Sequence, residues 1–440
     1  MHPLLAAAYR AAGAAATLAS RVAPEGEGKV LRALAARRHL AARLAEWGRT
    51  HRDPTRPLLW MHAPSVGEGL QARPVLELFR ARRPDVQLAY TFYSPSAERF
   101  ARGLDVDFAD YLPFDTPHGA RQLLGALRPT ALAYAKLDVW PMLTAHLARC
   151  GVRVGMVSAA VAPGSTRRGR VARALLREAY ASLEAVGAVS QADAERLTTL
   201  GVRPEAVHVT GDTRYDQVAA RAAAVDRSAP LLAPLASDRP TLVAGSTWPA
   251  DEAVLLAAWE SVRRLRPDAR LIIAPHEPTA SHLAPIERWA ASAGLALARL
   301  GEARQAIADV VLVDRVGVLG ELYALATAAF VGGGFHAAGL HSVLEPAAFG
   351  VPVAFGPRYQ DARDAVLLAD AGGGAPVLDR DYAAARLADW LGRSDSWRAS
   401  GERARAFVTR NIGAAERSYA LVASLLHGER TPGGRGGGGR

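Results

Sequence analysis

The sequence predicts an α/β protein with two doubly wound domains, each a parallel sheet with helices on both faces. Short apolar runs alternate with helical patterns, which is the rhythm of parallel strands joined by crossover helices. This rhythm occurs on both sides of a proline-containing segment at 227–240. A length of 440 residues is also more typical of two domains than of one.

The expected strands are apolar runs of five to eight residues that end in polar or glycine-rich loops. In the first half they are 58–64, 86–93, 129–135, 152–158 and 185–190. In the second half they are 241–246, 269–275, 310–314, 328–334 and 351–357. The composition change before Pro240 marks the domain boundary. We therefore expect basic and apolar helices at 1–50, a first domain at 51–226, a second at 227–426 and a disordered, glycine-rich tail at 427–440.

Composition limits the class of protein. Half of the residues are hydrophobic, and the single cysteine, Cys150, excludes an internal disulfide or a cysteine-based metal site, so a reducing compartment is expected. The net charge of +10 suits nucleic acid, anionic lipid or a phosphorylated substrate, although arginine-rich composition also arises from a GC-rich genome. The sequence contains no recognisable nucleic-acid-binding module.

The N-terminal segment allows two interpretations. Residues 1–24 are apolar, but Arg10 and Arg21 interrupt them and they are too alanine-rich for a membrane span. A compact positive region typical of a signal peptide is missing. The basic helical pattern at 29–49 suits the surface of an anionic membrane, and it equally suits ordinary helices packed on the first domain.

The segment at 329–357 reads as strand, glycine-rich loop, short helix and strand. Gly332, Gly333 and Gly334 allow a sharp turn and a close approach to a ligand. We expect a helix near His341, with Ser342 as N-cap and Glu345 completing a capping box. A loop before a helix N-terminus favours phosphate, whereas the alternative is a plain connection in which Glu345 only caps its own helix.

Other polar residues follow predicted strands. Glu68 lies near an expected helix start after the first strand and is either a general base or a first-turn residue stabilised by the helix dipole. Ser246 and Thr247 suit an anion site or a cap for the helix with Asp251 and Glu252. His276 follows the next strand, where a histidine also serves for packing.

Taken in order, these motifs resemble the Kdo transferases, bacterial enzymes that move 3-deoxy-D-manno-octulosonic acid (Kdo) from CMP-Kdo to lipid A precursors. The matching segments cover about residues 58 to 370. They are HAPSVGEG (62–69), TFYSPSAE (91–98), YLPFD (111–115), KLDVWPML (136–143), VSQADAERLTTLGV (189–202), VTGDTRYD (209–216), AGSTWPADE (244–252), IIAPHEP (272–278), VGVLGELYALATAAFVGGG (316–334) and HSVLEPAAFGVPVAFGP (341–357). The resemblance implies the GT-B fold, two Rossmann-like domains facing across a cleft, with acceptor in the first domain and nucleotide-sugar in the second.

The resemblance also implies roles for three residues of the first domain. Glu68 matches the catalytic base that deprotonates the acceptor hydroxyl. Asp138 and Arg214 match a carboxylate and a lysine that stabilise the transition state, where negative charge develops on the departing phosphate. Lys136, near Asp138, either supplies positive charge that is missing where the family's arginine is replaced or is a surface lysine at a strand end.

In the second domain, the resemblance implies a CMP site with Glu345 on the ribose hydroxyls. Pro275 and His276 match the family's Pro-Arg pair, and Gly317, Val318 and Leu319 match its Gly-Glu-Leu segment. The other residues expected to bind the nucleotide are Ser246, Thr247, Gly333, Gly334, Ser342, Val343 and Leu344. Trp248, His276 and Ser342 depart from the commoner family pattern, which we interpret as a donor site remodelled as a unit.

The sequence therefore predicts an inverting glycosyltransferase that acts at the cytoplasmic face of the inner membrane, without nucleic acid. No cofactor or metal ion is expected, because no Asp-x-Asp pair follows a predicted strand. Two alternatives remain open: another GT-B enzyme that uses a UDP-sugar, as transferase or epimerase, and a nucleotide-binding relative without turnover. The sequence leaves the oligomeric state undetermined.

Overall fold

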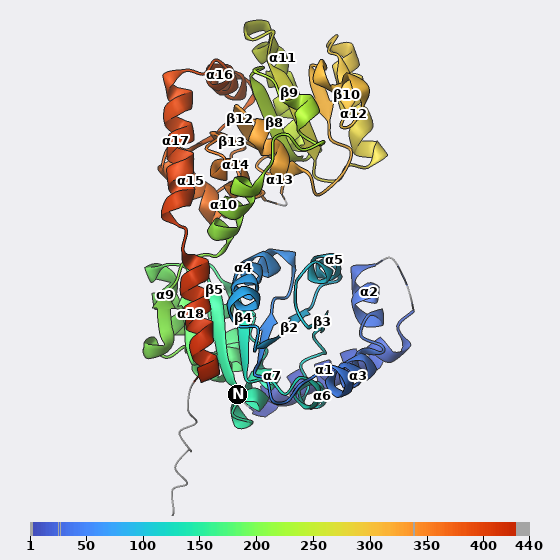
Figure 1. Cartoon of the computed structure of the whole chain (residues 1–440), viewed down its shortest axis with the longest axis vertical. Coiled ribbons are helices and arrows are strands. Elements are labelled where there is room, and N and C mark those ends of the chain that lie inside the picture. The colour runs from blue at the N-terminus through green and yellow to red at the C-terminus, as the bar shows by residue number, and fades with distance from the viewer. Residues whose placement is uncertain (1–2, 25, 27, 338, 428–440) are drawn as a thin grey trace, which may run out of the picture. The chain divides into compact units, whose positions relative to one another are not determined.

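The computed structural model describes residues 3–24, 26, 28–337 and 339–427 and divides the chain into two compact units (Figure 1). Unit 1 contains the described residues up to Asp216 and those from Gly413 onward, and unit 2 runs from Gln217 to Ile412. Each unit is built around its own parallel sheet, in agreement with the expected α/β class.

Unit 1 has a sheet of seven parallel strands in the order β3-β2-β1-β4-β5-β6-β7. The central strands are buried along their whole length, because helices cover both faces. The strands are β1 (Leu58–His62), β2 (Gln87–Phe92), β3 (Phe108–Tyr111), β4 (Ala131–Ala135), β5 (Arg153–Ala159), β6 (Ala185–Ala188) and β7 (Val207–Val209).

The helices of unit 1 include one from the far end of the chain. They are α1 (Pro3–Val22), α2 (Lys29–Ala35), α3 (Leu40–Thr50), α4 (Val66–Arg82), α5 (Glu98–Arg102), α6 (Pro117–Leu127), α7 (Pro141–Arg149), α8 (Arg170–Ala181), α9 (Gln191–Leu200) and α18 (Ala414–His427). α18 packs against α4 and β5, as Figure 1 shows.

Unit 2 repeats the architecture with seven strands in the order β10-β11-β9-β8-β12-β13-β14. They are β8 (Thr241–Thr247), β9 (Arg270–Pro275), β10 (Leu297–Arg299), β11 (Val310–Leu312), β12 (Ala328–Val331), β13 (Val353–Phe355) and β14 (Gly374–Pro376). Alternate residues enter two separate cores: Leu242 and Ala244 of β8 lie in one, and Val243 lies in the other. Both faces of this sheet are therefore covered.

The helices of unit 2 flank that sheet. They are α11 (Pro249–Leu265), α12 (Ala280–Ser292), α13 (Leu319–Leu322), α14 (Leu344–Ala348), α15 (Arg363–Asp370), α16 (Arg380–Leu391) and α17 (Asp395–Arg410). All strands of each sheet run in one direction. The loops that carry the predicted site residues therefore lie at the carboxyl ends of the strands.

The chain passes between the units at Asp216, inside α10 (Arg214–Ala224), and again at Gly413. This differs from the expected second domain at 227–426. Leu232 and Leu235, from the proline-containing segment, belong to a core of unit 2, whereas Val422 and Leu425 of α18 belong to the core of unit 1. Packing, and not the position of prolines, sets the boundary.

Asp216 joins the two crossing segments. Its carboxylate accepts hydrogen bonds from the backbone N–H groups of Gly413, at 2.7 Å, and Ala415, at 3.1 Å. The carboxylate thereby caps α18, whose first N–H groups have no partner within the helix. His427 ends that helix, and residues 428–440 of the expected tail lie outside the described residues.

The N-terminal helices pack on unit 1 and also expose apolar side chains. Tyr9 on α1 donates a hydrogen bond to Asp115, and Leu40 and Leu44 of α3 lie in the core. Exposed apolar residues on α1 and α2 are Leu4, Leu18, Val22, Val30 and Leu31. Within the described ranges, no helix has the length and apolar character needed to cross a bilayer.

Candidate active site

Glu68 lies in the first turn of α4, directly after β1. Both oxygens of its carboxylate are engaged: the Ser65 hydroxyl donates to Oε2, and Lys136 Nζ lies 3.3 Å from Oε1. The side chain keeps 17% of its surface exposed. Burial works to raise the pKa of Glu68, but the Ser65 hydrogen bond and the Lys136 ammonium outweigh it, so that the pKa lies below its ordinary value.

Asp138 follows β4, the neighbour of β1 in the sheet. Its cationic partner is Arg167, whose Nη2 lies 3.3 Å from Oδ1. Burial acts to raise the pKa of Asp138, whereas His62 and Arg167 lower it to below the ordinary value. Oδ2 is buried and has no hydrogen-bond partner among the described residues.

His62, the last residue of β1, is fully buried, and its Nε2 lies near Asp138. Trp140 Nε1 donates to His62 Nε2 at 3.1 Å, and His62 Nδ1 lies 2.9 Å from the Thr91 hydroxyl. Because an indole nitrogen only donates, Nε2 is an acceptor and the ring carries its proton on Nδ1. His62 Nε2, 3.5 Å from Asp138 Oδ2, is thus committed to Trp140, and we assign the low pKa of Asp138 mainly to Arg167.

Arg214 begins α10, in the loop region after β7. Its guanidinium binds the buried carboxylate of Asp212 through Nε, at 3.0 Å, and Nη2, at 2.7 Å. Gln71, on α4, donates to the same carboxylate at 3.2 Å. Burial raises the pKa of Asp212, but Arg214 and Gln71 lower it overall. Asp212 thus connects Arg214 to the helix that carries Glu68.

Three of the described non-glycine residues with positive φ lie at carboxyl ends of strands. Lys136 (φ 64°) follows β4, Ser158 (φ 50°) lies at the end of β5, and Ser246 (φ 54°) lies at the end of β8. Left-handed backbone costs a residue with a Cβ about 1 kcal/mol or more, and such strain gathers at functional sites. Both units therefore have strained backbone at the strand ends where the site residues are predicted.

The N–H groups of the glycine-rich loop after β12 bond to a carboxylate of the same chain. The buried Asp251 carboxylate accepts the N–H groups of Gly333, at 2.7 Å, and Phe335, at 3.0 Å, and also that of Trp248, at 2.9 Å. A carboxylate of the same chain therefore already accepts the Gly333 N–H group, and a nucleotide contact at Gly333 stays a prediction.

The glycines themselves serve close backbone packing. A Cβ at Gly332 would overlap the Ser246 carbonyl, and a Cβ at Gly334 would overlap the backbone of Gly356. The absence of side chains thus lets loops of the protein approach one another, where the sequence suggested an approach to a ligand. Thr247 donates to Glu252 at 2.8 Å, so it supports α11, one of the two roles expected for it.

Four rings stack beside this loop in the order His336, Trp248, His276, His341. Their centroids are 4.4, 4.7 and 4.4 Å apart. Trp248 Nε1 also donates to His341 Nε2 at 3.2 Å. Burial and the nearby His276 lower the pKa of His341, which agrees with a neutral ring that accepts this bond. Trp248 and His276, two of the three departures from the commoner pattern, are therefore in direct contact.

The expected capping box at Ser342 does not form. α14 begins at Leu344 with Val343 at the N-cap position, and the Ser342 hydroxyl accepts the Leu344 N–H at 3.4 Å. Glu345 instead pairs with Arg221 of α10, whose Nη1 lies 3.2 Å from its Oε1. Because the helix begins one residue later than expected, Glu345 occupies the second position after the cap and not the third that a capping box requires, and its carboxylate pairs with the distant arginine.

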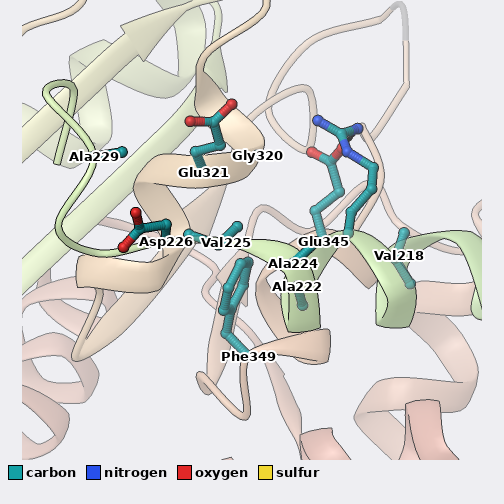
Figure 2. A pocket seen from close by; sticks show the side chains of 11 residues that line it. Val218, Ala222, Ala224, Val225, Asp226, Ala229, Gly320, Glu321, Glu345 and Phe349 are labelled. Atoms are coloured by element: carbon teal, nitrogen blue, oxygen red, sulfur yellow. Dashed lines mark hydrogen bonds and ion pairs between the residues drawn. The ribbon is translucent and has the colours of Figure 1, made fainter.

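Glu345 lines a cavity of about 290 Å³ within unit 2. Figure 2 shows the cavity residues, with Glu345 and Asp226 on opposite sides of the view. Gly320 and Glu321 of the Gly-Glu-Leu sequence at 320–322 line it, whereas Gly317, Val318 and Leu319 do not, and the expected nucleotide contacts at 317–319 stay a prediction. Burial raises the pKa of Glu345, and Arg221 offsets this only in part.

The remaining expected nucleotide residues lie at the same sheet edge. Pro275 ends β9 and precedes His276, whose N–H bonds to the Thr247 carbonyl at 2.9 Å.

Across the described part of the chain, no group of three or more histidine, cysteine, aspartate or glutamate side chains has a geometry suited to a metal ion.

Comparison with known proteins identifies the family. The family model described as 3-Deoxy-D-manno-octulosonic-acid transferase (kdotransferase) matches residues 38–217. A 3-deoxy-D-manno-octulosonic acid transferase of Bordetella pertussis is 31% identical over 401 residues, which cover 87% of this chain and 91% of that protein. One of Aquifex aeolicus is 25% identical over 310 residues, covering 70% and 78%.

Solved structures support the architecture. A putative UDP-N-acetylglucosamine 2-epimerase of Listeria monocytogenes superposes with a TM-score of 0.62 at 14% identity and covers 86% of this chain and 98% of its own. At that identity the likeness concerns the fold, which is GT-B. Because the Bordetella relative is 31% identical over most of both chains, this chain belongs to the Kdo transferase family and is a glycosyltransferase that transfers Kdo.

Proposed function

We propose that the enzyme moves Kdo from CMP-Kdo to a hydroxyl of a lipid A precursor of the lipid IVA type, with inversion at the sugar and without a metal ion. The observation that carries this proposal is the Glu68 carboxylate. It lies at the carboxyl end of a central strand, partly buried, with a pKa below its ordinary value. It is therefore ionised and ready to accept a proton at neutral pH.

In the proposed reaction, the acceptor O–H bond breaks and its proton passes to Glu68. The oxygen forms a bond to the anomeric carbon of Kdo, while the bond from that carbon to the CMP phosphate oxygen breaks and CMP leaves with the electron pair. Arg214 stabilises the negative charge on the departing phosphate, with Asp212 orienting its guanidinium. Asp138, held by Arg167, stabilises the cationic sugar of the transition state.

For the donor, we propose that Glu345 accepts hydrogen bonds from the ribose hydroxyls of CMP. Its cavity of about 290 Å³ is close to the lower end of the range for small-molecule sites. Ser246, Pro275, His276 and the 342–344 segment surround the phosphate and base in this proposal. His276 donates one ring N–H in place of the arginine of the commoner pattern.

For the acceptor, we propose contact with an anionic membrane surface at the cytoplasmic face of the inner membrane. The exposed apolar residues Leu4, Leu18 and Val22 of α1 and Val30 of α2 support peripheral insertion. Arg10, Arg21 and Arg32 on the same helices add attraction to anionic lipid, which salt weakens.

The decisive assay incubates the full chain with CMP-Kdo and a tetra-acylated lipid A precursor, with and without EDTA, and identifies the product by mass. We expect the mass of one or more Kdo units to be added and CMP to be released in equal number, unaffected by EDTA. Glu68→Gln should lower turnover by about 10²- to 10⁴-fold while it still binds CMP. Near wild-type turnover in a folded Glu68→Gln protein would exclude Glu68 as the base.

The same assay tests the alternatives. A UDP-sugar transferase or epimerase would bind UDP more tightly than CMP in calorimetry and would leave CMP-Kdo intact. A relative without turnover would bind CMP and form no product.

A further inference from the structure

Lys136 is an unusual residue for this chain. The sequence contains 53 lysines and arginines, and only Lys29 and Lys136 are lysines. Lys29 is exposed on α2, whereas Lys136 follows the central strand β4 and contacts Glu68. A lysine ammonium is a compact point charge, while arginine presents a broad planar fork. A lysine therefore stands beside Glu68 in a protein that uses arginine at nearly every other cationic position.

The backbone at Lys136 is strained at the residue whose side chain contacts Glu68. Its φ is 64°, a left-handed conformation that costs a lysine about 1 kcal/mol. Its N–H remains bonded to the Val157 carbonyl, at 2.9 Å, so the residue is fixed to the neighbouring strand while its side chain leaves in a new direction. Nζ then lies 3.3 Å from Glu68 Oε1, across 68 residues of sequence. A glycine at 136 would avoid the strain but have no side chain to place there.

Among the described groups around Glu68, Lys136 is the cation that contacts its carboxylate. Ser65, in the turn before α4, donates to Oε2 as a neutral hydroxyl. Tyr90, on β2, is buried with its hydroxyl unpaired among the described residues, and the nearby Glu68 charge adds to the burial that raises the pKa of Tyr90. Tyr90 is therefore a neutral phenol. Arg167 and Arg214 hold Asp138 and Asp212.

We propose that Lys136 is a positioning residue for Glu68, which holds the carboxylate in its ionised form and directs Oε1 within the site. This inference rests on the proposed role of Glu68 as general base. Without the ammonium, burial favours the protonated carboxyl, which cannot accept a proton from the acceptor. Lys136 thereby extends activity toward acid pH, at the cost of making Glu68 a weaker base than a buried carboxylate alone.

The sharpest variant is Lys136→Gly. Glycine adopts a φ of 64° without strain, so this protein should unfold at the same temperature as wild type or higher. We expect the acid limb of the pH profile of kcat/KM to move to higher pH, with activity falling about tenfold for each pH unit below the new pKa. Lys136→Arg should retain the wild-type limb, and Lys29→Met is the matched control for loss of one lysine.

Two measurements separate this inference from the proposed function. The first is the pH profile: an acid limb of Lys136→Gly that coincides with those of wild type and Lys29→Met overturns the role of Lys136, as does a uniform loss of activity at every pH. The second is the titration of Glu68 by infrared or ¹³C carboxyl difference spectra against Glu68→Gln. A Glu68 pKa that rises in Lys136→Gly supports the pairing even if Glu68→Gln proves active, in which case only the role of Glu68 as base fails.

Discussion

Arg221 Nη1 lies 3.2 Å from Glu345 Oε1, so the carboxylate proposed to hold ribose is paired with an arginine from a helix more than a hundred residues earlier in the chain. A Cβ at Gly320 would approach both side chains, which means that α13 closes over the pair. The charged groups around Glu345 in the cavity are Arg221, Glu321 and Asp226, and the buried phenol of Tyr323, whose pKa is raised by burial and by Glu345, is a neutral neighbour.

Arg221→Met should weaken CMP binding, most strongly at low pH. The pKa of Glu345 is already raised by burial, and Arg221 is the group that lowers it. Removing the guanidinium leaves more Glu345 protonated and unable to accept two ribose hydroxyls. We expect Kd for CMP to rise about tenfold at pH 6 and less at pH 8 by calorimetry. Arg227→Met, an exposed arginine nearby, is the control, and an equal loss in both variants would contradict a specific role.

Glu345→Gln should make the protein more stable and less able to bind CMP. A carboxyl whose pKa is raised in the folded state makes the folded protein lose stability as pH rises through its ordinary value of 4.5. Glutamine lacks that charge, so the melting temperature should increase at pH 8 and change little at pH 4. CMP affinity should fall by about 10- to 100-fold, equivalent to about 1.5–3 kcal/mol. A variant that is less stable at pH 8 would show that Glu345 is structural.

Gly332→Ala should destabilise the protein by about 1–3 kcal/mol, because the new Cβ would overlap backbone atoms of Ser246 and Thr247 that cannot move aside. Gly125→Ala is the matched control: it lies in α6 with open space around it and should stabilise by about 0.5–1 kcal/mol. Thermal unfolding of both proteins checks the pair. Equal effects would mean that the glycine loop relaxes and that its close packing is not required.

Arg214→Met should cost about 2 kcal/mol of unfolding free energy at neutral pH, since it leaves the buried Asp212 carboxylate without its cation. The pKa of Asp212 is lowered in the folded protein, so its contribution is present above the ordinary value of 3.8 and is lost as pH falls through the folded value. The difference from wild type should therefore shrink toward acid pH. Denaturant titrations measure it, with Arg73→Met, in an exposed pair worth about 0.3–0.5 kcal/mol, as control. A difference that does not change with pH would contradict the pairing.

The sequence predicted the interior of both sheets and missed their edges. All ten expected strands are interior strands, and the four that were not expected, β3, β7, β10 and β14, are the outermost strands of the two sheets. Interior strands are buried on both faces and read as continuous apolar runs. Edge strands have three or four residues and partly exposed side chains, as in β7, so they lack that signal.

The glycine-rich segment shows that the sequence also failed to predict which groups contact one another at the site. Its composition indicated a phosphate loop, but the fold brings Asp251, from a helix about eighty residues earlier, onto its N–H groups. Ser342 and Glu345 have capping-box spacing, yet the Glu345 carboxylate forms an ion pair with Arg221. Spacing predicts a local bond and carries no information about a stronger partner elsewhere in the chain.

The sequence by itself determined the α/β class, the family resemblance and the position of Glu68 at a helix start after a central strand. These follow from local periodicity and from motif order. Only the tertiary structure decided which groups surround each carboxylate: Lys136 on Glu68, Arg167 on Asp138 and Arg221 on Glu345. The reason is physical, because the charge state of a carboxyl depends on burial and on cations within about 4 Å, and folding brings these from distant parts of the chain.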